Sequence, residues 1–201
     1  MSGTDHPRVG EQRPGGRAAR VRAQVLAATN ALLDEAGYAG VGYDEVARRA
    51  GVHKTTVYRR WPSKHELIAD ALDLQSEINV PMPDTGTLAG DLRALGRAVA
   101  ANISSAEGTR RAWTIVAAAA HTEDLAATVH GFMQRRITLA ESIIERAIQR
   151  GEIAVDTDPR RVIESIVGPL WFRLLLTGEP LDESAVDALV DQTVAGLAAT
   201  A

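Results

Sequence analysis

A glycine between two short helical patterns constrains this chain of 201 residues more than any other feature. Gly51 directly follows a segment, Glu45 to Ala50, in which Val46 and Ala50 stand four residues apart, the spacing of one helix face. Helices commonly end at a glycine with positive φ, so we expect the first helix to stop there. A second helix then starts at Lys54. Two helices joined by a short turn containing glycine form a helix-turn-helix.

The second helix of this pair carries side chains suited to contacts with duplex DNA, because in a helix-turn-helix it enters the major groove. Thr55 and Thr56 are small enough to let the helix approach base edges, and a threonine methyl can contact the methyl group of thymine. Trp61 is expected to be an apolar plug beneath the helix. The donors available for phosphate oxygens are Lys54, Tyr58, Arg59 and Arg60.

The next helix begins with a capping pattern that also points to phosphate. Ser63 and Glu66 have the spacing of a capping box, and Pro62 ends the preceding segment. Lys64 then falls in the first turn, where the positive end of the helix dipole disfavours a cation. A bound phosphate would remove this penalty and would use the helix amides as donors. We therefore expect Lys64 to contact the DNA backbone.

These residues carry a resemblance to a known family. The run from Val46 to Leu67, VARRAGVHKTTVYRRWPSKHEL, resembles the DNA-binding domain of the TetR family of transcriptional regulators, and the resemblance covers about residues 17–74. Three positions depart from the family pattern: Gly42 replaces a threonine or serine N-cap, His53 replaces a serine and Trp61 replaces a phenylalanine. His53 is therefore a further candidate for a phosphate or base contact.

Charge is divided unevenly along the chain. Residues 1–65 contain 11 Lys and Arg against 6 Asp and Glu, a balance of +5, whereas residues 66–201 contain 11 against 20, a balance of −9. A basic first part and an acidic remainder are expected when one end of a protein meets a polyanion, although chance variation of solvated charge is the alternative. Residues 1–16 have little to bury and are predicted to be a disordered basic arm. Arg17, which follows this arm, is a candidate for contact with the DNA backbone or minor groove, and a solubilising tail without contacts is the competing interpretation.

Composition favours an all-α fold, because aromatic residues make up only 4% and much of the apolar content is alanine and leucine. We expect two domains. Residues 17–74 form a helix-turn-helix DNA-binding domain of three helices, and residues 75–201 form a helical effector-binding and dimerisation domain. The boundary lies in the Pro- and Gly-containing segment 80–86 and the helix before it. Pro169 is expected to kink the helix that contains it. The predicted helices span about 17–36, 45–50, 54–58, 64–79, 88–104, 110–121, 123–150 and 158–176, with a last one after Pro180.

Several classes of protein and site find no support in the sequence. There is no cysteine, no histidine pair with the spacing of a metal site and no catalytic or nucleotide-binding motif, so we expect no enzyme activity, no metal and no cofactor. No apolar run reaches the length of a membrane span, and the N-terminus lacks the apolar region of a signal peptide. A cytoplasmic protein without a membrane partner is predicted.

The resemblance also implies a small-molecule partner, because the second domain of TetR-like proteins usually encloses an apolar or amphipathic effector that lowers affinity for the operator. For each candidate wall residue, a packed core position is the simpler interpretation. The candidate apolar walls are Trp113, Phe132, Met133 and Phe172, and the candidate polar contacts are Asn102 and His130.

The last two helices carry surplus apolar surface. The first of them is apolar nearly all round from Ile166 to Leu176, and the last has a narrow stripe of the coiled-coil type. Both features predict a homodimer with a four-helix bundle at its seam, as in TetR-like proteins, and a monomer core is the alternative. The candidate interface residues are Ile166, Leu170, Leu174, Val186, Leu189, Val190, Val194 and Leu197.

Together these patterns predict a homodimeric, ligand-responsive transcriptional regulator that binds a pseudo-palindromic, double-stranded DNA operator, with repression as its expected effect. One rival is a helical small-molecule carrier or enzyme whose basic first part is incidental. A second rival keeps DNA binding but makes the protein an activator, or a repressor that needs no ligand.

Overall fold

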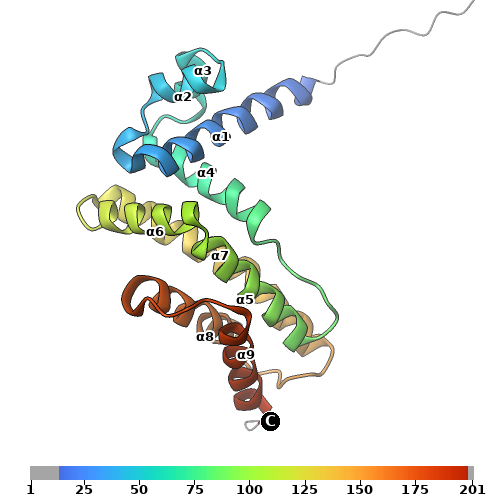
Figure 1. Cartoon of the computed structure of the whole chain (residues 1–201). Coiled ribbons are helices and arrows are strands. Elements are labelled where there is room, and N and C mark those ends of the chain that lie inside the picture. The colour runs from blue at the N-terminus through green and yellow to red at the C-terminus, as the bar shows by residue number, and fades with distance from the viewer. Residues whose placement is uncertain (1–13, 199–201) are drawn as a thin grey trace, which may run out of the picture.

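The computed structural model describes residues 14–198, which fold entirely into helices joined by short loops (Figure 1). We call α1–α4 the head and α5–α9, with the π-helical turn η1, the body. The elements are α1 (Pro14–Gly40), α2 (Tyr43–Ala50), α3 (Lys54–Arg60), α4 (Lys64–Asn79), α5 (Leu88–Ser104), α6 (Ala106–Ala119), α7 (Glu123–Gln149), α8 (Pro159–Phe172), η1 (Arg173–Thr177) and α9 (Glu183–Ala198).

The head is organised as the turn chemistry predicts. Gly51 ends α2 in the left-handed conformation with a φ of 66°, and its N–H reaches back to the carbonyls of Ala47 and Arg48. Trp61 lies at the end of α3 and is only 3% exposed, which confirms its expected place beneath that helix. Its indole N–H donates to Asp70 Oδ2 at 3.0 Å, and its carbonyl accepts a hydrogen bond of 2.8 Å from the Tyr43 hydroxyl. These bonds tie α2, α3 and α4 together.

Two helices begin at least three residues earlier than the sequence predicts. α1 begins at Pro14, so residues 14–16 belong to a helix, while residues 1–13 of the predicted arm lie outside the described residues. Gly37 adopts a φ of 66°, and a β-carbon there would lie 2.6 Å from Thr114 Cγ2, so glycine both bends α1 and lets α6 approach it. α6 starts at Ala106 and not at residue 110, because the Ser105 hydroxyl accepts from Gly108 N at 3.0 Å and caps the helix at that point.

The body places α5 and α7 between the head and the last two helices (Figure 1). α7 spans 27 residues and packs against α4, α5, α6 and α8. Gly96 of α5 gives room for α9, since a β-carbon there would lie 2.7 Å from Val186 Cγ1. Pro169 lies inside α8 without ending it, and the departure from α geometry comes one turn later, at η1, where Gly178 N donates to Arg173 O.

Burial within the body divides the predicted dimer residues into two groups. Ile166 and Leu170 of α8 and Val186 and Val190 of α9 are at most 1% exposed, because they pack into the body's own core. The remaining four, Leu174, Leu189, Val194 and Leu197, are half-buried at its edge. None of the helices within residues 14–198 combines the length and apolarity needed to cross a membrane.

Candidate functional site

The first candidate site is the outer surface of α3. Val57 is fully buried and anchors the helix, while the residues around it point outward. Thr56 is half-buried against the head. The exposed side chains are His53, Lys54, Thr55, Tyr58, Arg59 and Arg60, all of which the sequence selects as candidates for DNA contact.

Several contacts fix the orientation of this surface without closing it. Tyr58 is 57% exposed and meets the ring of Tyr43 edge-on, with centroids 5.4 Å apart. Lys54 Nζ lies 2.8 Å from Asp44 Oδ2, and both side chains are largely solvent-exposed. An exposed pair of this kind contributes at most about 1 kcal/mol, so a phosphate oxygen can replace the carboxylate. The Arg60 guanidinium lies 5.4 Å from the centre of the Trp61 ring.

The arginines of α2 are engaged within the head. Arg48 and Arg49 both donate hydrogen bonds to Glu45, and these bonds lower the pKa of that carboxyl to about 2. Arg49 also pairs with Glu35 of α1 at 2.7 Å. The network joins α2 to α1 and leaves α3 as the more available cationic surface of the helix-turn-helix.

Lys64 lies where the sequence predicts, in the first turn of α4 behind the Ser63 cap, but its ammonium turns inward. Lys64 Nζ donates to the carbonyl of Tyr38 at 2.6 Å and lies 3.9 Å from the centre of that ring. Burial lowers the pKa of this ammonium. A phosphate contact would use its other donors. Arg17 is exposed on the first turns of α1.

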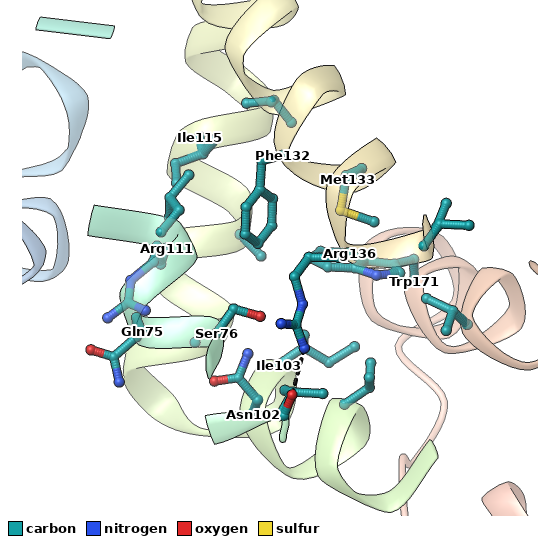
Figure 2. Close-up of a pocket in the computed structure, with 18 of the residues that line it drawn as sticks. Gln75, Ser76, Asn102, Ile103, Arg111, Ile115, Phe132, Met133, Arg136 and Trp171 are labelled. Atoms are coloured by element: carbon teal, nitrogen blue, oxygen red, sulfur yellow. Dashed lines mark hydrogen bonds between the residues drawn. The ribbon is translucent and has the colours of Figure 1, made fainter. Parts of the chain in front are cut away.

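The second candidate site is a cavity of about 280 Å³ among α4, α5, α6, α7 and α8 (Figure 2). Of the side chains predicted to surround an effector, Asn102, Phe132 and Met133 line it. Trp113, His130 and Phe172 do not, and all three are exposed. Each stands one position from a residue that does line the cavity, namely Ala112, Val129 and Trp171. A shift of one residue turns a side chain by about 100° around a helix, which moves it off the cavity face.

One corner of the cavity is polar. Figure 2 shows Arg136 of α7 reaching across the opening toward Ser76 of α4 and Asn102 of α5. The Arg136 guanidinium donates to the carbonyl of Val80, and burial lowers the pKa of its side chain. Sequence reasoning missed Arg136. The signal was present, because Arg136 stands four residues from both Phe132 and Ala140 and so interrupts an apolar face of α7.

Two walls of the cavity also touch the head. Ile115 of α6 lines the cavity and belongs to the head's core. Arg111, one turn earlier, forms a bidentate pair with Asp34 of α1, with Nε and Nη2 at 2.7 and 2.6 Å from the two carboxylate oxygens. On the other side, Leu72 of α4 is in the head's core and lines the cavity as well. Two helices that form walls of the cavity, α4 and α6, therefore also pack against α1.

Known proteins resemble the chain over nearly its whole length. Residues 25–71 match the model described as bacterial regulatory proteins, tetR family, and residues 82–193 match the one described as tetracyclin repressor-like, C-terminal domain. The HTH-type transcriptional regulator AqdR of Rhodococcus erythropolis is 35% identical over 92% of this chain and 89% of its own length. The DNA-binding transcriptional repressor TetR of Mycobacteroides abscessus is 32% identical over 86% of this chain and 90% of its own.

The solved structure of the TetR family transcription regulator SCO0332 shares 35% identity and superimposes with a TM-score of 0.76, covering 88% of this chain and 98% of that one. The chain belongs to the TetR family of transcriptional regulators. Membership confirms the all-helical fold with an N-terminal helix-turn-helix and a C-terminal helical domain. It also makes the protein a DNA-binding regulator from a family that is not enzymatic.

Proposed function

We propose that this TetR-family protein is a homodimeric repressor that binds a pseudo-palindromic operator and leaves it when a small molecule fills the cavity of the body. The observation that carries the proposal is the position of that cavity, whose walls α4 and α6 also pack against α1 of the head. The relative from Mycobacteroides abscessus is named a repressor, which supports this direction of regulation.

In the proposed complex α3 lies in the major groove, with Thr55 and Thr56 against base edges. Two heads of a dimer would reach half-sites about 34–36 Å apart, one turn of DNA. The phosphate contacts would come from Lys54, Tyr58, Arg59, Arg60 and Lys64, with Arg17 and His53 as further contacts at the edges.

The proposed dimer seam is the outer side of α8, η1 and α9, the end of the body farthest from the head (Figure 1). Phe172 and Leu176 expose 55% and 75% of their surface there, and such large apolar side chains are typical anchors of an interface. Leu174, Leu189, Val194 and Leu197 lie half-buried on the same elements and would complete it. The four buried residues of the predicted stripe instead support the seam from within.

Release would be a shift between two arrangements of the body. An effector that binds one arrangement more tightly favours it, and it weakens DNA binding by the same coupling free energy. The Arg111–Asp34 pair and the shared helix α4 are the contacts through which a change at the cavity would reposition α1.

Selection of bound sequences from random DNA, followed by titration of the selected operator, tests the DNA-binding part of the proposal. Thr56→Ala should change which operators bind, whereas Arg59→Met should weaken all sequences alike and reduce the salt slope by about 1. Arg135→Met, at an exposed arginine of α7 outside both α3 and the proposed seam, is the matched control and should change neither. Unchanged titrations for both α3 variants would contradict the assignment of α3.

A reporter gene placed behind the selected operator decides the direction of regulation. Deletion of the regulator should raise transcription, because the bound dimer is expected to block it. A fall in transcription on deletion would instead make the protein an activator.

Analytical ultracentrifugation of the Phe172→Asp, Leu176→Asp double variant tests the seam, which should dissociate when two carboxylates are placed in an apolar interface.

A further inference from the structure

We propose that the effector of this cavity is an amphipathic anion, with an apolar alkyl or aryl part and one negatively charged group, such as a carboxylate, bound by Arg136. The inference rests on the proposed function in taking the cavity as the effector site, and it adds the chemical class of the ligand.

Arg136 is a half-buried cation without a partner of opposite charge. Its hydrogen bond goes to a neutral backbone carbonyl, that of Val80, and none of the ion pairs found within residues 14–198 involves it. Asp73 and Glu77 favour its charge only from a distance, while burial opposes it. A buried charge is costly unless it is paired, so an anion bound in the cavity would offset the cost of burying this guanidinium.

The other arginines of α7 show that this situation is particular to Arg136. Arg135, the preceding residue, turns to the surface and pairs with Asp73 of α4 at 2.7 Å. Arg146, three turns later, lies 3.6 Å from both Asp84 and Asp91. A general excess of arginine therefore does not explain why the guanidinium on the cavity face has no carboxylate partner.

The surroundings of Arg136 offer donors and no acid. No aspartate or glutamate lines the cavity, and its other cation, Arg111, is already neutralised by Asp34. Among the described residues no partner is assigned to the Ser76 hydroxyl, and the Asn102 amide accepts from Asn79 Nδ2 at 2.7 Å, which leaves its own N–H groups available. A planar guanidinium flanked by a hydroxyl and an amide matches the two oxygens of a carboxylate.

The rest of the cavity favours a ligand whose remaining part is apolar. Ile115, Phe132, Met133 and Trp171 surround it, and Figure 2 shows Phe132 and Trp171 on either side of the Arg136 side chain. A volume of about 280 Å³ corresponds to about nine groups the size of a water molecule, each with about 30 Å³. The cavity thus suits a compact molecule with one charged end.

Isothermal titration of the full chain without DNA tests the inference with matched probes. Octanoate is compared with octanamide and octylamine, and naphthoate with naphthamide, so that the ligands of each set differ only in their polar end group. We expect the acids to bind about ten- to a hundredfold more tightly than the amides, the range that a hydrogen-bonded charge provides, and the amine to bind least. Quenching of tryptophan fluorescence on binding should disappear in Trp171→Phe and persist in Trp113→Phe, whose indole lies outside the cavity.

Variants at two adjacent arginines assign the preference to one residue. Arg136→Met should remove the advantage of acid over amide, Arg136→Lys should retain part of it, and Arg135→Met should leave it unchanged. Equal binding of acids and amides to the unaltered chain, or no binding by any acid, would overturn the proposal that the ligand is an anion. Because no operator is present, either result leaves the DNA-binding proposal standing, and loss of operator binding would in turn leave this assignment untouched.

Discussion

The head and the body of this regulator use their buried volume in different ways. In the head, large side chains such as Leu26, Leu33 and Ile68 are at most 1% exposed, and the Trp61 indole and the Tyr43 hydroxyl both form hydrogen bonds within the head. The body encloses a cavity with an unpaired guanidinium at one corner. Dense packing permits one arrangement, whereas an unfilled space permits more than one. The difference supports the proposal that the head presents α3 as a fixed surface and that conformational change begins in the body.

α4 belongs to both regions. Leu67, Ile68 and Ala71 in its first half lie in the head's core, while Gln75 and Ser76 in its second half line the cavity. In the proposed mechanism, this continuous helix would convert a local change in the cavity into a movement of the head. α6 provides a parallel connection through Ile115 and Arg111, so the two regions share two packed helices and not one linker.

The largest effect is expected from removing the central side chain of the head. Trp61→Ala deletes a buried indole and its hydrogen bond to Asp70, and should destabilise the protein by about 3–5 kcal/mol. Urea unfolding followed by circular dichroism measures the loss. Trp113→Ala is the control, because that indole is 47% exposed on the body, and it should cost less than about 1 kcal/mol. Similar losses for the two variants would show that the head is no more tightly packed than the body.

The next effect concerns the connection between the regions. Arg111→Met leaves Asp34 without its bidentate partner, although both side chains are mostly buried, at 13% and 18% exposure. The cost should be about 2–3 kcal/mol, as for hydrogen bonds between charged groups. Asp34→Asn should be less harmful in the Arg111→Met background than alone, and a double-mutant cycle measures this coupling.

The role of the Arg111–Asp34 pair can also be tested by measuring how the ligand changes the affinity for the operator. If the pair transmits the effector signal, Asp34→Asn, whose side chain lies outside the cavity lining, should still bind octanoate but should lose the dependence of operator affinity on the ligand. Full retention of ligand-dependent release would mean that α4 and the Ile115 contact of α6 connect the cavity to the head without this pair.

Local chemistry made the head predictable from the sequence. Gly51, Ser63 and the spacing of α2 and α3 depend on turns and caps that a few adjacent residues determine, and α4 was predicted with the bounds that it has, 64–79. The same is true of α5, which Thr87 caps through a hydrogen bond from Gly90 N. Such features require no knowledge of what the helix packs against.

The body was less predictable because its helices have apolar residues on more than one side. Periodicity identified α6, α7 and α8 but not which face meets the cavity, and so Trp113, His130 and Phe172 were each chosen one position away from a lining residue. The stripe of α9 likewise looks the same whether it meets a partner subunit or α5 of its own chain. Nothing local in the sequence distinguishes Arg136, which donates to a backbone carbonyl, from Arg135, which pairs with Asp73.

A matched pair of alanine substitutions tests the difference in packing directly. Ala71→Leu adds volume to the filled core of the head, where Ala71 is 0% exposed, and should destabilise by about 1–3 kcal/mol. Ala112→Leu points into the cavity from α6 and should change stability by less than about 1 kcal/mol, because empty space receives the side chain. Thermal and urea unfolding of both variants provide the comparison. Equal destabilisation would show that the cavity wall cannot accept a larger residue.

The smallest effect separates two helix caps, one in each region. Ser63 Oγ accepts from Glu66 N at 3.1 Å at the start of α4, whereas Thr122 caps α7 without a side-chain hydrogen bond. Ser63→Ala should therefore cost about 1 kcal/mol and Thr122→Ala only a few tenths, measured by urea unfolding. If Thr122→Ala costs as much as Ser63→Ala, then the α6–α7 corner is as firmly held as α4, and flexibility of the body would have to come from the cavity alone.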